Sequence, residues 1–225
     1  MKIGILMTGH AVPEIAARHG DYDAMFARLL AGHGFEFASY DVEDNVLPDS
    51  PRECDGWLIT GSKHAVYEDH PWIAPLEAFI REVAQSAQPM IGICFGHQII
   101  AQALGGEVVK YPGGWSVGLK TYEIESERLT LVAWHQDQVV SCPEGAEVIG
   151  HSAFCANAAL RYGTRMLTIQ PHPEFPPAVL ADLIRLRGRG VVPEALLEEA
   201  QAGLDTPDDA ARFAARMARF LKREQ

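Results

Sequence analysis

The sequence predicts an α/β fold: an open, mostly parallel sheet flanked by helices, with a smaller antiparallel sheet and C-terminal helices. Over the first hundred residues, apolar runs of strand length alternate with amphipathic runs of helix length. This alternation is typical of a parallel sheet with right-handed crossovers. After residue 107, glycines and β-forming residues alternate instead, which favours antiparallel strands. The last fifty residues carry apolar stripes at helical spacing.

Glycine, proline and changes of hydrophobic period bound the elements of the first half. Residues 2–8 predict a buried strand, and the polar stretch 9–23 predicts a loop long enough to border a site. Parallel sheets gather their reactive groups at the carboxyl ends of the strands, where Gly9, Gly61 and Cys94 fall. The further elements expected are a helix around 25–30, strands at 35–42 and 56–60, and a helix around 76–84.

The segment 89–98, PMIGICFGHQ, predicts a short buried strand, a tight turn and a helix. Cys94 lies in the turn between Gly92 and Gly96. A hydrolase serine occupies the same context, because glycines let the backbone pass close by while the nucleophile projects above the sheet. Cys94 is therefore a candidate nucleophile. The alternative is a packed thiol, since free cysteine is among the most buried residue types.

The second half predicts antiparallel strands, a final buried strand and helices. No repeat, low-complexity tract or linker interrupts the chain, so we expect a single domain over 1–225. Its catalytic core would cover about 2–185 and a C-terminal helical extension about 186–225. The C-terminal stripes could pack on the core or form the face of a homodimer. The expected strands lie within 107–125, 129–134, 147–150, 158–162 and 166–170, and the stripes at 179–184 and 210–221.

Composition and charge exclude several classes of protein. The 225 residues are 48% hydrophobic and 22% charged, and the formal net charge is −11, which is ordinary for a globular enzyme. No nucleic-acid partner is expected, because binding a phosphate backbone needs a concentrated basic face. The N-terminal MKIGILMTGH reaches His10 too soon for a signal peptide or a spanning helix.

The four cysteines have no CxxC or CxxH spacing, so neither a zinc site nor a disulfide framework is expected. We therefore expect a cytoplasmic protein with no metal, no cofactor and no membrane contact.

His172 is the histidine whose position suits a partner of Cys94. A cysteine nucleophile needs a histidine as base and acid, and that histidine needs an orienting group. His172 follows a buried strand between Pro171 and Pro173, and Glu174 lies two residues further on. On extended backbone, residues two apart point the same way, so Glu174 can orient the His172 ring. The alternative is a surface turn that contains a histidine.

These residues resemble a known family. Residues 92–98, GICFGHQ, match the G-[IVL]-C-x-G-x-Q signature of class I (triad-type) glutamine amidotransferases, and His172-Pro173-Glu174 matches their H-P-E signature. Thr60-Gly61-Ser62 resembles the oxyanion loop after the third strand of these enzymes, and residues 135–139, HQDQV, resemble their H-x-D-x-V segment. The resemblance covers about residues 2–174 and implies a flavodoxin-like or Rossmann-like sheet, related to the amidotransferase domain of GMP synthase.

The resemblance implies a role for each matched residue. Cys94 would attack the side-chain amide of glutamine, and a helix N-terminus and a nearby histidine would both favour its thiolate form. The N–H groups of Gly61 and Phe95 would stabilise the oxyanion, worth roughly 3 kcal/mol each. His172, oriented by Glu174, would protonate the departing ammonia and later activate water. Gln98 would bind the amino-acid end of the substrate.

Two departures affect the details of the substrate pocket. Many members of the family have a second glycine where this chain has Ser62, and a glycine where it has Gln136. Neither change removes a catalytic group. We expect His135 and Asp137 to have a mainly structural role.

The sequence supports three functional hypotheses. The first is a glutaminase-type amidotransferase that acts alone or passes ammonia to a synthetase subunit in trans, since no fused synthetase or nucleotide motif is expected. The alternative is a γ-glutamyl hydrolase that cleaves γ-glutamyl amines or peptides with the same residues. The third is a non-catalytic, thiol-based regulatory domain, which the complete Cys-His-Glu set disfavours. The acceptor of the ammonia stays open.

Overall fold

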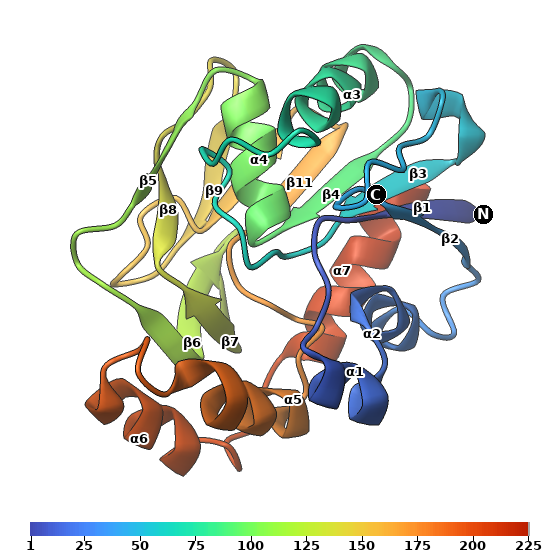
Figure 1. Ribbon diagram of the computed structural model, residues 1–225. Helices are drawn as coiled ribbons and strands as arrows, with labels where there is room; N and C mark the ends of the chain where they lie inside the picture. Colours follow the sequence, from blue (N-terminus) through green and yellow to red (C-terminus); the bar gives the residue numbers. More distant parts are fainter. Residues whose placement is uncertain (225) are drawn as a thin grey trace.

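The computed structural model describes residues 1–224 and has a nine-stranded sheet at its centre (Figure 1). Every residue of three central strands is buried, as expected for parallel strands covered on both faces. The parallel strands, in spatial order, are β2 (Glu36–Asp41), β1 (Lys2–Met7), β3 (Gly56–Ile59), β4 (Met90–Ile93) and β11 (Met166–Ile169).

Antiparallel strands continue the same sheet beyond β11. They follow in the order β10 (Ala159–Tyr162), β9 (Glu147–His151), β6 (Ser116–Ile124) and β7 (Glu127–His135). A small separate sheet pairs β5 (Glu107–Lys110) with β8 (Asp137–Ser141). The predicted fold class is confirmed, and most of the antiparallel strands extend the parallel sheet because β10 pairs directly with β11.

Helices cover the sheet and its end. Asp21 caps one of them by accepting a hydrogen bond from the backbone N–H of Tyr22. A 3₁₀ turn, η1 (Pro51–Glu53), precedes β3, and a π-helical turn, η2 (Ile184–Gly188), follows the fifth α-helix. The α-helices are α1 (Pro13–His19), α2 (Tyr22–Leu29), α3 (Ile73–Gln85), α4 (Phe95–Ala103), α5 (Pro177–Leu183), α6 (Glu194–Ala202) and α7 (Ala210–Lys222).

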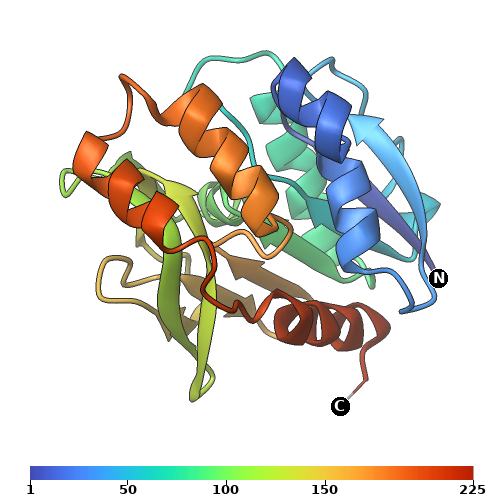
Figure 2. The same ribbon diagram turned by 90° about the horizontal axis from the view of Figure 1, so that it is seen from below.

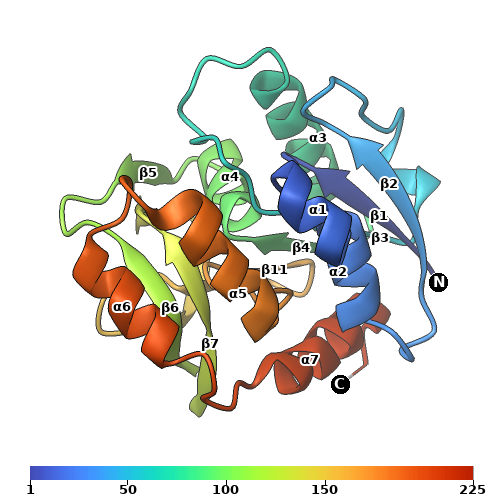
Figure 3. The ribbon, with the colours of Figure 1, turned by 60° about the horizontal axis from the view of Figure 1, so that its bottom comes forward.

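The two faces of the parallel strands carry separate apolar cores. Ile3 and Ile5 of β1 pack with residues of α2 and α7, whereas Leu6 packs with residues of α3 and α4. This division follows from the alternation of side chains along a strand. Figure 3 shows α2 and α7 together under the parallel strands, with α3 and α4 on the other side.

A third apolar cluster joins α1, α5 and α6 to the antiparallel end of the sheet. Figure 2 shows the orange-red helix α6 lying against the yellow-green strands β6 and β7, with the orange helix α5 beside it. Gly118 of β6 has a φ of 92°, and a Cβ there would lie 2.8 Å from Cβ of Ala200 in α6. A glycine at this position therefore lets α6 approach the sheet.

One part of the expected organisation needs correction. The stretch 9–23 is not a continuous loop, because α1 occupies residues 13–19 with Pro13 in its first turn. Ile15 is the one buried residue of this helix, so no apolar stripe marks it in the sequence. Within residues 1–224, no helix is long and apolar enough to span a bilayer.

Candidate active site

Cys94 forms the turn between β4 and α4. Its φ of 54° and ψ of −103° lie outside the regions that a residue with a side chain usually adopts, and such strain is typical of functional sites. The Cys94 N–H donates to the carbonyl of Ile169 in the neighbouring β11, at 2.8 Å. The residue is 7% exposed and lines a cavity.

The glycines on both sides of Cys94 are required by close backbone contacts. A Cβ on Gly92 would lie 2.5 Å from the carbonyl oxygen of Gly96, and one on Gly96 would lie 2.4 Å from that of Ile59. Both distances are shorter than a carbon–oxygen contact allows. The glycine spacing that the sequence predicts as part of a sharp turn therefore has a steric basis in the structure.

The structure brings His172 and Glu174 together. His172 lies three residues beyond β11, where its N–H donates to the carbonyl of Val132 at 2.8 Å. Nδ1 of His172 lies 2.7 Å from Oε1 of Glu174, and both side chains are buried. The His172 ring also stacks on Phe175, with centroids 4.3 Å apart and planes 8° apart. The ring is thus fixed from one edge and one face.

His172 lies beside Cys94, because both side chains approach Gly61 and line the same cavity. Since Glu174 holds Nδ1, Nε2 is the nitrogen left for the thiol. Burial alone would lower the pKa of His172, but the charges of Glu174 and Cys94 outweigh burial and raise this pKa well above its ordinary 6.5. The imidazolium is therefore the favoured form of His172 at neutral pH.

Gly61 lies beside both side chains. A Cβ at Gly61 would be 2.9 Å from Cε1 of His172 and 3.7 Å from Cβ of Cys94. The preceding Thr60 carbonyl accepts the N–H of Gly96 at 3.1 Å, which ties this loop to the start of α4. Within residues 1–224, the N–H groups of Gly61 and Phe95 donate no backbone or side-chain hydrogen bond. Two free donors thus flank the thiol.

Gln98 lies in the wall of the site, with its amide nitrogen used inside the protein. Nε2 donates to the carbonyl of Asp137 at 2.9 Å and to Oε1 of Gln170 at 3.1 Å. These bonds tie α4 to the start of β8. A direct contact between Gln98 and a substrate stays a prediction, and the structure adds a bracing role for this side chain.

Cys94 lines a cavity of about 230 Å³, together with Gly61, Phe95, Gln98 and His172. The motifs do not predict the rest of its wall. Three cationic side chains reach the cavity from separate segments, together with two tryptophans whose ring centroids are 6.5 Å apart. The cations suit a carboxylate and the rings suit apolar groups. These residues are Lys63, Lys110, Arg187, Trp115 and Trp134.

His135 and Asp137 lie in the same wall, although the sequence predicts a mainly structural role for them. Nδ1 of His135 lies 3.2 Å from the carbonyl of Asp137, and the Asp137 carboxylate accepts the Tyr67 hydroxyl at 3.0 Å. Burial lowers the pKa of His135 to about 3, so its ring is neutral. The contacts agree with a structural role, while the position beside the cavity is what the sequence misses.

A model of the class-I glutamine amidotransferases matches residues 22–183. This range includes Cys94, His172 and Glu174. The chain therefore belongs to the class-I glutamine amidotransferase family, and the resemblance that the motifs predict is confirmed.

Relatives in this family differ in how much of their length the chain matches. A glutamine amidotransferase-like protein of Schizosaccharomyces pombe is 32% identical over 97% of this chain and 98% of its own length. γ-Glutamyl peptidase 4 of Arabidopsis thaliana is 29% identical over 92% of this chain and 89% of its own. GMP synthase of Clostridium acetobutylicum is 30% identical over 69% of this chain and 31% of its own length.

Solved structures support the fold. A glutamine amidotransferase of Methylobacillus flagellatus superposes with a TM-score of 0.80 at 23% identity, covering 99% of this chain and 94% of its own. A glutamine amidotransferase of Thermotoga maritima gives a TM-score of 0.75 at 21% identity, covering 99% and 97%.

Proposed function

We propose that the chain hydrolyses a γ-glutamyl amide bond, with Cys94 as nucleophile, His172 as acid and base, and Glu174 as the orienting carboxylate. L-Glutamine is the first proposed substrate, giving glutamate and ammonia. The position of His172 beside Cys94, with its ring held by Glu174, carries this proposal. The strained backbone of Cys94 at the start of α4 supports it further.

The first half of the reaction forms a thioester. The Cys94 sulfur attacks the γ-carbonyl carbon, and the carbonyl oxygen becomes an oxyanion held by the N–H groups of Gly61 and Phe95. As the carbon–nitrogen bond breaks, the His172 imidazolium gives its proton to the leaving nitrogen. Ammonia or an amine departs, and the γ-glutamyl group stays bonded to sulfur.

The second half releases glutamate. His172, now neutral, takes a proton from a water molecule that attacks the thioester carbonyl. The carbon–sulfur bond then breaks, restoring the thiolate of Cys94 beside the imidazolium. Glu174 keeps the ring oriented through both halves, because its bond to Nδ1 leaves Nε2 free for the proton transfers.

Hydrolysis of γ-glutamyl peptides is the second candidate function. The relative named γ-glutamyl peptidase matches this chain over nearly the full length of both, whereas GMP synthase matches over a third of its own. The cavity also extends past Cys94 to Trp115 and Trp134, where the amine side of a larger substrate would fit. A partner synthetase in trans belongs to the first candidate alone.

A substrate panel separates the two candidates. Purified protein is given L-glutamine, γ-glutamyl dipeptides and the matching α-glutamyl dipeptides, and released ammonia, amine and glutamate are measured. Turnover of glutamine favours the amidotransferase half-reaction, and preferential turnover of γ-glutamyl dipeptides favours the peptidase. Cys94→Ala should abolish either activity, with Cys142→Ala, at a half-buried cysteine in another part of the fold, as the matched control. Absence of turnover with every γ-glutamyl compound would contradict both candidates.

A further inference from the structure

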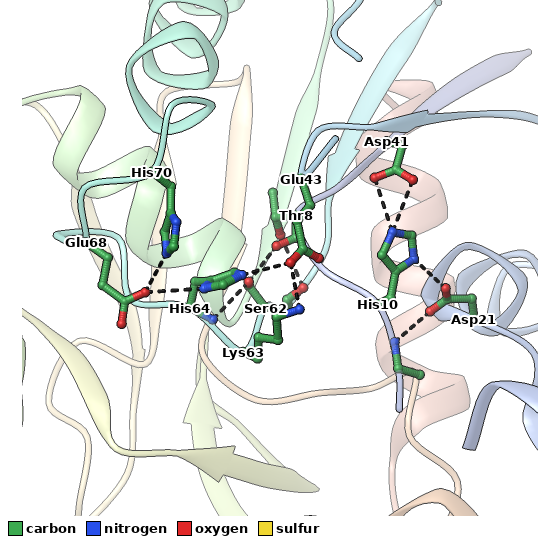
Figure 4. A network of polar contacts seen from close by, with 12 residues as sticks. Thr8, His10, Asp21, Asp41, Glu43, Ser62, Lys63, His64, Glu68 and His70 are labelled. Atoms are coloured by element: carbon green, nitrogen blue, oxygen red, sulfur yellow. Dashed lines mark hydrogen bonds and ion pairs between the residues drawn. The ribbon is translucent and has the colours of Figure 1, made fainter. Parts of the chain in front are cut away.

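The loop between β3 and α3 carries two histidines and a glutamate that converge at the rim of the cavity (Figure 4). Nδ1 of His64 lies 3.3 Å, and Nε2 of His70 lies 2.8 Å, from the same oxygen of Glu68, Oε2. One donor atom from each of the three residues lies within 4.8 Å of the others. A modest rotation of the side chains would place all three atoms around one point.

We propose that His64, Glu68 and His70 bind a divalent transition-metal ion of the Zn²⁺ class. Two imidazole nitrogens and one carboxylate oxygen form a donor set that suits Zn²⁺, Co²⁺ and Ni²⁺ better than Mg²⁺ or Ca²⁺, which prefer oxygen. The sequence does not predict this site, because its expectation of no metal depended on cysteine spacing. The signal is instead the spacing His-x₃-Glu-x-His within one loop.

The remote nitrogen of His64 has the partner that a metal-binding histidine needs. Nε2 of His64 lies 2.9 Å from Oε1 of Glu43, which also pairs with Nζ of Lys63 at 2.7 Å. Metal-binding histidines usually donate their other N–H to a carboxylate, which fixes the tautomer. In the tautomer that donates from Nε2 to Glu43, Nδ1 is an acceptor that faces Oε2 of Glu68. A cation between these two acceptors would satisfy both.

Trp72 holds the two imidazole rings in place. It is buried, at 2% exposure. The ring of His70 stacks on it with centroids 5.7 Å apart and planes 7° apart, and the ring of His64 meets it edge-on at 5.8 Å. Such packing preorganises ligands and lowers the entropy lost when a metal binds.

The open coordination positions of the ion would face the cavity and solvent. His64 and Glu68 line the cavity that Cys94 faces, whereas His70 lies outside its wall. Trp72 in turn contacts Phe95, the residue after Cys94, with ring centroids 5.5 Å apart. A bound ion would therefore add positive charge at the mouth of the cavity.

Metal titration of the full chain tests this site. Protein freed of metal with a chelator is titrated with Zn²⁺ by calorimetry and with Co²⁺ by visible absorption. We expect one equivalent to bind, with Co²⁺ bands that report bound nitrogen ligands. His70→Ala removes one ligand and should weaken binding at least about tenfold. His151→Ala, at an exposed histidine outside the cluster, is the matched control and should bind as the parent does.

A second variant separates this site from the reactive thiol. Cys94→Ala should still bind Co²⁺ with the parent's affinity, because Cys94 is not one of the three proposed ligands. Loss of binding in Cys94→Ala, equal affinity in His70→Ala and the parent, or absence of any uptake would each overturn the proposal. In the last case the three side chains form only a hydrogen-bonded cluster. Circular dichroism of each variant verifies that the fold is retained.

Discussion

At the scale of single residues, the proposed mechanism gives Glu174 the most defined chemical task. Its side chain is 1% exposed, and one of its oxygens lies 2.7 Å from Nδ1 of His172. A buried carboxylate is costly unless it is paired, so the protein retains this pair at a cost in desolvation. The raised pKa of His172 depends on that charge.

Glu174→Gln should keep the shape of the site and remove the charge. Without the carboxylate, the imidazolium is less stable and the ring is less firmly oriented, so kcat on the best substrate should fall roughly 100- to 10,000-fold. Steady-state kinetics measure this fall. Glu199→Gln, at an exposed carboxylate that pairs with Lys120, is the control. A kcat within twofold of the parent in Glu174→Gln would mean that Glu174 has no part in the reaction.

At the scale of elements, the approach of α4 to β3 sets the position of the thiol. Gly96 N–H donates to the Thr60 carbonyl, and a Cβ on Gly96 would lie 2.4 Å from the Ile59 oxygen and 2.9 Å from its Cβ. These atoms are backbone or close to it, so they cannot move aside as a flexible side chain can. The strand and the helix must separate if residue 96 has a side chain.

Gly96→Ala should therefore destabilise the protein by about 1–3 kcal/mol or more. Urea denaturation gives the free energy of unfolding. Gly203→Ala is the matched control. A Cβ there would have its nearest contact at 3.5 Å, and the backbone of Gly203 is not in the left-handed region. Equal stability of the two alanine variants would show that the close contact at Gly96 relaxes freely.

The last helix, α7, belongs to the main core in the structure. Phe213, Met217 and Leu221 are buried with residues of β1 and α2, so we propose that α7 folds together with the sheet and is no detachable extension. This also leaves its apolar stripe unavailable as the face of a homodimer.

Met217→Ala should cost about 2–5 kcal/mol of unfolding free energy, because the methionine is fully buried. Arg219→Ala, at an exposed position on the same helix, should change the stability by less than about 0.5 kcal/mol. The same denaturation experiment measures both. A Met217→Ala variant as stable as the parent would indicate that α7 is only loosely docked.

At the scale of the whole molecule, the ion pairs of His10 link the ends of two sheet strands to a helix. His10 lies after β1 and contacts Asp21 at the start of α2, at 2.7 Å, and Asp41 at the end of β2, at 3.1 Å. Burial lowers the pKa of His10, but the two carboxylates outweigh it and the net shift is upward from 6.5. The folded protein therefore binds the proton more tightly than the unfolded chain.

The sign of this shift predicts how stability depends on pH. The contribution of His10 is fully present below about pH 6.5 and is lost as the pH rises through the folded pKa. The thermal midpoint of the parent should exceed that of His10→Gln by more at about pH 5.5 than at about pH 8.5. His33→Gln serves as the control. If the difference in thermal midpoint between the parent and His10→Gln is constant or grows with pH, the two carboxylates do not stabilise a protonated His10.

Much of the fold and the centre of the site could be predicted from the sequence. The strand, turn and helix around Cys94 carry their own glycines, and His172 and Glu174 are only two residues apart in the sequence and in contact in the structure. The cavity wall could not be predicted, because Lys110, Trp134 and Arg187 come from distant segments without a shared motif. The short helix α1 could not be predicted either, because it buries a single residue and so has no apolar stripe.

Trapping a covalent intermediate tests the proposed role of Cys94 as nucleophile most directly. Protein mixed with its best γ-glutamyl substrate is quenched in acid within the first turnover, digested and analysed by mass spectrometry. We predict a γ-glutamyl adduct on the peptide that contains Cys94, removed by hydroxylamine and absent from Cys94→Ala. Full turnover with no adduct on that peptide, or with an adduct on another residue, would contradict the mechanism.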